Sequence, residues 1–276
     1  MNRFVLCALA AWISAAALAD EPAAVAALTA PQIVEKNVAA RGGLEAWRKI
    51  ETMAWVGRIE TVNAPTPSMP FLLEMKRPNK TRFEILASGQ KSVRIYDGTD
   101  GWKLRPTSSG TDLQPYKAEE LRFAHDGYVI DGPLIDHAAK GIAVALDGVD
   151  EVEGRKAYRL SLKMPSGARQ QVWIDAETFL DIKSNRESAN PAGRPGMVSV
   201  FYRDYRTVEG LQIPLVIESG AATGKATDKL LIERIALNPE LDERLFAKPN
   251  VPLRRNAATV GAGPSQGARR SSRAAR

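Results

Sequence analysis

From residue 52 onward, short runs recur in which apolar side chains occupy every second position. Such alternation is typical of strands that bury one face, and turn sequences such as Pro165-Ser166-Gly167 separate the runs. The alternating positions are Met53, Trp55 and Ile59; Phe71, Leu73 and Met75; Phe83 and Ile85; Val93 and Ile95; Trp102 and Leu104; Tyr158, Leu160 and Leu162; Val172 and Ile174; Leu180 and Ile182; Val198, Val200 and Tyr202; Leu211, Ile213, Leu215 and Ile217; and Leu230 and Ile232. These ten or eleven runs predict a mainly β (α+β) fold, a curved antiparallel half-open β-barrel.

Two segments have helical patterns instead. Residues 28–50 place apolar residues on one helical stripe, with Thr29 as an N-cap, Pro31 in the first turn and a break at Gly42-Gly43. Residues 116–125 are rich in helix formers, and residues 133–140 are expected to add a turn or two. Because a large sheet with one apolar face must cover that face, we expect the N-terminal helix and this mid-chain helical insert to close the barrel, the insert as its lid.

The first residues predict a secretory signal peptide. Residues 1–19 start with Arg3, continue as an uncharged run and end on Ala17-Leu18-Ala19, which predicts export to the periplasm and cleavage after Ala19. A membrane anchor is the alternative, but the run is shorter than the ~20 apolar residues that a spanning helix needs. Cys7 lies within the signal, so the exported protein is expected to have no thiol.

The last residues predict a disordered tail. Residues 251–276 hold six arginines and no acid among Gly, Ala, Ser and Pro, and such a segment cannot bury enough apolar surface to fold. The predicted organisation is a signal peptide at 1–19, a single folded domain at 20–250 and a basic tail at 251–276.

The net charge of the chain belongs to this tail. The formal charge is +6 and the isoelectric point is near 9.4, which suggests an anionic partner. Without Arg3 and the six tail arginines, residues 20–250 carry a formal charge of −1. Export argues against nucleic acid, so we expect the tail to hold the protein near anionic membrane surfaces, at about 1 kcal/mol per basic residue. A merely solubilising tail is the alternative.

Motifs for catalysis are absent from the sequence. Two histidines and one cysteine are too few for a zinc site of about four such ligands, and no Gly-x-Ser-x-Gly motif marks a nucleophile. Residues 220–226 depart from the phosphate-loop pattern in spacing. We therefore predict no cofactor, no metal and no catalytic residue. A periplasmic hydrolase with two unmarked carboxylates across a cleft is a minor alternative.

Several short motifs occur in an order that resembles a known family. These motifs are Lys76-Arg77-Pro78-Asn79, Asp97-Gly98, Trp102, Pro106, QVWIDAETFL at 171–180 and FAKP at 246–249. Their order, behind a signal peptide, resembles the LolA/LolB-like superfamily of periplasmic lipoprotein carriers, in particular its outer-membrane lipoprotein-sorting members. The resemblance spans most of residues 30–250.

The resemblance implies an open antiparallel barrel with a helical lid and an apolar cavity that takes acyl chains. In the carrier, an arginine on an early strand bonds to the lid and holds the empty cavity shut. Carried onto the Lys-Arg-Pro-Asn motif, this role implies that Arg77 is the lid latch; a solvated turn arginine is the alternative. The helical insert, the longer body and the basic tail depart from the carrier and leave the cargo and the docking partner open.

We therefore predict a non-enzymatic periplasmic carrier or binder of lipid or lipoprotein acyl chains, a chaperone of outer-membrane biogenesis with inner- and outer-membrane handoff partners. If the alternating positions face inward, the lining residues are Trp55, Phe71, Leu73, Met75, Phe83, Ile85, Ile95 and Trp102. A register error of one residue would turn each of them to the other face. The alternative function is a regulatory or sensory module of the same fold that binds lipoprotein or a membrane partner in envelope-stress signalling.

Overall fold

A computed structural model describes residues 28–62, 67–108, 110–189, 195–222, 224 and 227–250. The predicted signal peptide (1–19) and basic tail (251–276) lie outside the described residues. The helices are α1 (Ala30–Ala40), α2 (Leu44–Arg48), α3 (Ala118–His125) and the 3-10 helix η1 (Glu243–Leu245). The strands are β1 (Thr52–Thr61), β2 (Ser68–Lys76), β3 (Lys80–Ala87), β4 (Gln90–Tyr96), β5 (Gly101–Thr107), β6 (Gly110–Pro115), β7 (Ala143–Val152), β8 (Arg155–Lys163), β9 (Arg169–Asp175), β10 (Asp181–Ala189), β11 (Pro195–Val208), β12 (Leu211–Ala221) and β13 (Asp228–Leu237). Among the described residues, no helix combines the length and apolar character needed to span a membrane.

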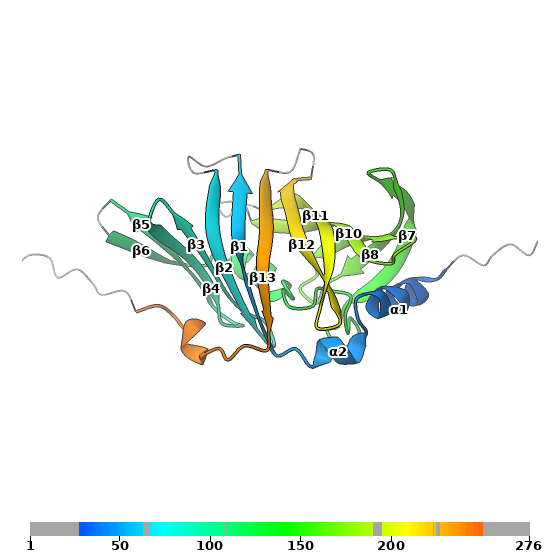
Figure 1. Cartoon of the computed structure of the whole chain (residues 1–276), viewed down its shortest axis with the longest axis horizontal. Helices are drawn as coiled ribbons and strands as arrows, with labels where there is room; N and C mark the ends of the chain where they lie inside the picture. The colour runs from blue at the N-terminus through cyan, green and yellow to red at the C-terminus, as the bar shows by residue number, and fades with distance from the viewer. Residues whose placement is uncertain are drawn as a thin grey trace, which may run out of the picture.

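The strands form one curved sheet in the order β6-β5-β4-β3-β2-β1-β13-β12-β11-β10-β9-β8-β7 (Figure 1). Each strand pairs with its neighbour in sequence, and the antiparallel pairing of β1 with β13 joins the two halves. The predicted curved antiparallel fold is confirmed. β6 and β7 are the two edges of the sheet, so the connection between them, residues 116–142 (the insert), has to cross from one edge to the other.

The strand count is thirteen instead of the ten or eleven expected. The two additional strands are the edges, β6 and β7. β6, with the sequence GTDLQP, has a single aliphatic residue, Leu113. In β7 the apolar positions Val144, Leu146 and Val149 are separated by Asp147-Gly148, a pair that favours turns. Edge strands bury little side-chain surface, so their sequences show little of the alternation that identifies the central strands.

The predicted N-terminal helical region is present as α1 and α2, and it is broken at Gly42-Gly43 as expected. The φ angles of Gly42 and Gly43 are 110° and 88°, in the region that favours glycine. A Cβ on Gly42 would lie 2.5 Å from the carbonyl oxygen of Gly210, so the close approach of the β11–β12 turn also requires glycine there. The break lets α2 turn under the sheet while α1 lies against β7 (Figure 1).

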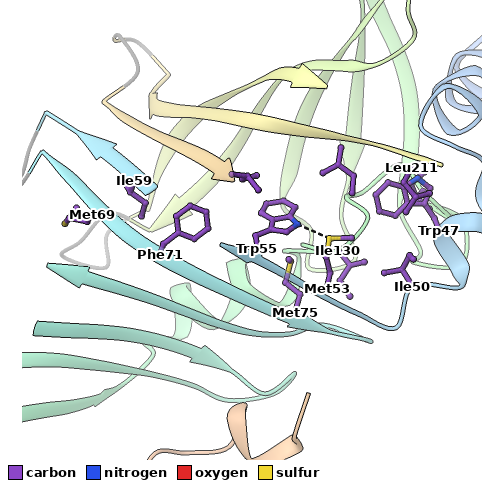
Figure 2. Packing of buried hydrophobic residues seen from close by; sticks show 13 residues of the cluster. Trp47, Ile50, Met53, Trp55, Ile59, Met69, Phe71, Met75, Ile130 and Leu211 are labelled. Atoms are coloured by element: carbon purple, nitrogen blue, oxygen red, sulfur yellow. Dashed lines mark hydrogen bonds between the residues drawn. The ribbon is translucent and has the colours of Figure 1, made fainter. Parts of the chain in front are cut away.

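The insert contributes to both apolar cores. One core follows β1 and β2 from Ile59 and Met69 to Trp47, and Ile130 of the insert packs beside Trp55 in it (Figure 2). The second core lies under α1 and includes Leu134 of the insert. Residues 133–140 form turns, in keeping with the turn or two expected there.

Candidate functional site

A cavity of about 270 Å³ lies between the inner face of the sheet, the face that carries Trp55, and the insert. Its apolar lining comes from four parts of the chain: α2, the strands β1 and β2, the strands β9 to β12, and the insert. The apolar and aromatic lining residues are Trp55, Leu73, Val172, Val200, Tyr202, Tyr205, Ile213, Pro214 and Ile217 on the sheet, Trp47 on α2, and Phe123, Tyr128, Val129, Ile130 and Pro133 on the insert. This arrangement offers an apolar site beneath the insert. The insert covers the site but takes no part in the strand pairing of the sheet.

Two of the eight predicted lining residues, Trp55 and Leu73, line this cavity. They are cross-strand partners on β1 and β2. The side chains of Phe71 and Met75 share their face but are buried in the first core, where they leave no room for a ligand.

Phe83 and Ile85 lie on the inner face too. The registers pair Leu73 with Phe83 and Phe71 with Ile85, and paired residues of an antiparallel sheet share a face. Both residues pack against the first core and line a second, separate hollow beside β4 and β5. Six of the predicted residues therefore share one face, but the structure brings only two of them to the main cavity.

Ile95 and Trp102 lie on the outer face, which corrects the expectation that they point inward. They pair with each other, while their neighbours Arg94 and Lys103 form the adjacent pair and follow Phe83 on the inner face. Ile95 is fully buried on the outer side, where its partner Arg82 donates to the carbonyl oxygen of Leu245 at 3.2 Å. The chain around η1 therefore covers the apolar side of β4, and this sequence alternation belongs to the outer face.

Arg77, the predicted latch, contacts the insert. Its Nη2 donates to Asp131 Oδ2 at 2.9 Å, and its Nε and Nη2 donate to the carbonyl oxygens of Ile50 (2.7 Å) and Trp47 (3.0 Å). Asp131 is almost fully buried and also accepts from Lys140 Nζ at 2.6 Å. Arg77 thus links the carbonyl groups at the end of α2 to a buried carboxylate of the insert.

The carbonyl groups of the insert helix are bound by Asn79 rather than by Arg77. Asn79 Nδ2 donates to the carbonyl oxygens of Ala124 and His125 at 2.9 and 2.7 Å, which lie at the C-terminal end of α3. A side-chain donor at this end satisfies carbonyl groups that lack a partner within the helix. The turn between β2 and β3 therefore holds the insert at two points, one ionic and one through backbone carbonyls.

A second ionic contact attaches α3 to β4 and β5. Glu120 is buried and accepts from Lys103 Nζ at 2.7 Å and from Arg94 Nη2 at 3.1 Å. Burial raises the pKa of Glu120, but the hydrogen bonds from Lys103 and from the backbone N–H of Lys117 outweigh it, so its pKa lies below the usual range. On the far side, Arg122 of α3 donates to Glu187 of β10 at 2.7 Å.

Sequence reasoning missed the half of the cavity contributed by β9 to β12. Val200, Tyr202, Ile213 and Ile217 all stand in alternating runs, so their strand pattern was visible. What brings them opposite Trp55 is the β1–β13 pairing between the two ends of the folded domain, and a local pattern carries no information about such a pairing.

The polar lining was also missed. It consists of Arg41, Asp126, Gln170, Asp181, Ser184, Arg186 and Glu187. Ser184, Arg186 and Glu187 belong to the polar run of residues 183–188, and Gln170 stands beside Gln171, so no motif in the sequence distinguishes them from solvated side chains.

No protein-family model and no curated protein matches the chain. Solved structures do match it, with low sequence identity. A LolA superfamily protein from Nitrosomonas europaea is 17% identical, with a TM-score of 0.51, over 80% of this chain and 99% of that one. A putative outer-membrane lipoprotein-sorting protein domain from Vibrio parahaemolyticus is 11% identical, with a TM-score of 0.53, over 79% and 96%. A DUF1329 family protein from Desulfovibrio piger is 13% identical, with a TM-score of 0.51, over 79% and 97%. The chain therefore has the fold of LolA superfamily and lipoprotein-sorting proteins, as the resemblance in its sequence implied.

Proposed function

We propose that this protein is an exported carrier or binder that holds the acyl chain of a lipid or lipoprotein non-covalently. The observation that carries the proposal is the apolar cavity between the sheet and the insert. Its volume of about 270 Å³ is near the lower end of the range of roughly 300–1,000 Å³ for small-molecule sites. Each CH₂ group of a chain that moves from water into this lining contributes about 0.8 kcal/mol.

The insert would act as the lid of this site. It crosses the cavity, contributes lining residues such as Phe123 and Ile130, and is held by the contacts of Arg77, Asn79 and Glu120. A ligand that displaces Ile130 from Trp55 has to compete with these contacts, so their strength sets the affinity. In this mechanism Arg77 is the latch that favours the closed, empty state.

Titration with an acyl probe tests the proposal. The exported chain is mixed with 11-(dansylamino)undecanoic acid, whose fluorescence rises in an apolar site, and with a triacylated lipopeptide as competitor. We expect saturable binding of the probe and its displacement by the lipopeptide. Absence of saturable binding to either compound would contradict the proposed function.

The hydrolase alternative predicts two facing carboxylates, and the cavity is not free of acids. Asp126, Asp181 and Glu187 line it, but each has a partner that accounts for its place: the hydroxyl of Ser166, Arg41 at 3.6 Å and Arg122 at 2.7 Å, respectively. These pairings favour a role in holding the site together. We propose binding without catalysis; hydrolysis of a p-nitrophenyl acyl ester, lost on Asp126→Asn or Asp181→Asn, would instead support the hydrolase.

Handoff partners at the inner and outer membranes follow from the proposed carrier role. The sensory alternative differs in its expected behaviour: it predicts a stable complex with an inner-membrane protein and no turnover of cargo. Cross-linking in cells followed by a pulse-chase of labelled lipoprotein separates the two, because a carrier loses its cargo during the chase.

A further inference from the structure

The cavity has a polar end. Gln170, Ser184, Arg186 and Tyr202 line it on β9, β10 and β11, and we refer to these four residues as the rim cluster. The registers bring them together, because Arg186 pairs with Gln170 across β9 and β10. The hydroxyl groups of Ser184 and Tyr202 lie 3.0 Å apart.

The rim cluster extends toward one end of the strands. From Ile59 near the end of β1, the registers lead through Leu230 and Ile217 to Tyr202. Val198, the partner of Arg186, lies four residues from Tyr202 along β11, toward the end of the sheet at which β1 ends. Trp55 lies four residues from Ile59 in the opposite direction. Arg186 therefore stands toward the strand ends, and the apolar lining at Trp55 and Leu73 lies deeper along the sheet.

Arg186 makes no ion pair among the residues that the structure describes. Of the other charged lining residues, Arg41 lies 3.6 Å from Asp181, and Glu187 is bound by Arg122. Within the described part of the chain, no carboxylate lies within 4.0 Å of the guanidinium group of Arg186. Its side chain is half-buried, so this cation is partly removed from water without a counter-ion.

Arg186 and Tyr202 line the same cavity. Burial raises the pKa of Tyr202, and the hydrogen bond between Tyr202 and Ser184 and the positive charge of Arg186 act against that increase.

We propose that Arg186 binds the anionic head of a single-chain amphiphile, a carboxylate or phosphate monoester, while the tail extends over Leu73 and Trp55. The assignment rests on the proposed function and names the ligand class for that site. A guanidinium group has donors in a planar fork that suits both kinds of oxyanion, and charge-assisted hydrogen bonds are the strong ones in partly buried sites. Gln170, Ser184 and Tyr202 add neutral donors around the same head group.

A matched pair of probes tests the assignment. The full exported chain is titrated with 11-(dansylamino)undecanoic acid and with its methyl ester, which lacks the charge. We expect the wild type to bind the acid about ten-fold more tightly than the ester, in keeping with one hydrogen bond to a charged group. Arg186→Gln should remove this preference by weakening the binding of the acid, and Arg186→Lys should retain part of it.

Arg234→Gln is the matched control. Arg234 is exposed and pairs with Val56 on the outer face of β13 and β1, so its loss should change the affinity for neither probe. Circular dichroism of each variant checks that the fold is kept. If Arg186→Gln does not fold, the test is a reduced preference of Arg186→Lys for the acid over the ester.

The outcomes separate the two proposals. Failure of both probes to bind the wild type would overturn the proposed function together with the head-group site. Equal binding of acid and ester, unchanged in Arg186→Gln, would overturn the head-group site and leave the acyl-binding cavity in place. Inorganic phosphate should not displace the acid at millimolar concentration; displacement that depends on Arg186 would assign the site to a free anion and overturn the amphiphile.

Discussion

At the scale of single residues, the site separates side chains that hold the insert from side chains that leave space for a ligand. Leu73 and Trp55 line the cavity. Phe71 and Met75 lie two residues from Leu73 in each direction and on the same face, but they are buried in the core. The difference lies in how closely other side chains pack against each of these residues. Periodicity identifies the face of a strand, but it does not identify which residues of that face another segment will cover.

Filling the cavity should reduce ligand binding without unfolding the protein. Leu73→Trp adds an indole ring to the cavity, and we expect it to weaken binding of the dansyl probe at least ten-fold because the added ring occupies ligand space. Fluorescence titration measures this effect. Leu72→Trp places the same ring on the outer face, since Leu72 pairs with Val56 and Glu84, and should bind the probe like the wild type. Equal loss in both variants would contradict the placement of the ligand.

Removal of Arg77 should weaken the closed state. Arg77→Leu leaves the carbonyl groups of Trp47 and Ile50 without this donor and leaves Asp131 with Lys140 as its remaining cationic side-chain partner. We expect the free energy of unfolding to fall by about 1–3 kcal/mol, as for other buried hydrogen bonds to charged groups. If Arg77 is the latch, the variant retains its cargo and fails to hand it on.

Urea denaturation and transfer of labelled lipoprotein to acceptor vesicles measure these two effects. Arg58→Leu is the control, because Arg58 makes an exposed ion pair with Glu233 and its loss should cost less than about 1 kcal/mol. Normal cargo transfer by Arg77→Leu would reduce Arg77 to a structural residue of the β2–β3 turn.

At the scale of elements, α3 joins the two halves of the sheet through side chains. Glu120 attaches it to β4 and β5, Arg122 to β10, and Asn79 holds its C-terminal end. The sequence indicated the helix, because residues 117–124 are good helix formers, but none of these partners could be inferred. Lys103 and Arg94 stand in alternating runs whose apolar members face the other side, so the sequence suggested that the charges were solvated.

Acid should release α3 from the sheet. The pKa of Glu120 is lower while the helix is attached than the ordinary value of 4.5, so the attached state binds a proton less readily than the detached one. The contribution of Glu120 is therefore complete above the ordinary pKa and is lost as the pH falls through the lowered value. We expect hydrogen exchange of residues 118–125, corrected for the intrinsic pH dependence, to rise below about pH 4.5 while that of β1 does not.

Substitution of Glu120 tests whether this group is responsible. Glu120→Gln should raise the exchange of residues 118–125 at pH 7 and flatten its pH dependence, because the amide cannot ionise. Glu233→Gln, which alters an exposed carboxylate far from α3 in the fold, should leave both unchanged. A pH dependence that persists in Glu120→Gln would assign the release to another acid, for example Asp136, whose hydrogen bond from Arg48 also lowers its pKa.

At the scale of the whole molecule, the fold class could be predicted from the sequence and the shape of the cavity could not. Alternating runs, turn residues and one helical insert indicate a curved antiparallel sheet with a cover, which the structure confirms. The closure of β1 on β13 joins residues more than a hundred positions apart, and the insert is held by contacts such as that of Arg77 with Asp131, 54 positions away. No local pattern encodes such contacts, and they decide which apolar residues remain available to a ligand.

The basic tail should add membrane binding that is independent of the cavity. Its six arginines lie outside the described residues, and the remainder of the exported chain has a formal charge near zero. Deletion of residues 251–276 should weaken salt-sensitive binding to vesicles that contain phosphatidylglycerol and leave the affinity for the acyl probe unchanged. Vesicle co-sedimentation at low and high salt measures the effect. Unchanged co-sedimentation would leave the tail a solubilising extension.

The connection of the insert to the two edge strands separates opening of the site from the backbone pairing of the sheet. All twelve strand pairings lie outside the insert, so residues 117–142 can move away while the backbone ladder stays complete. A ligand can then enter and leave on the timescale of a local opening, orders of magnitude faster than global unfolding. A few side chains such as Arg77 and Glu120 would then set the residence time of a ligand, while the strand pairings stay unchanged.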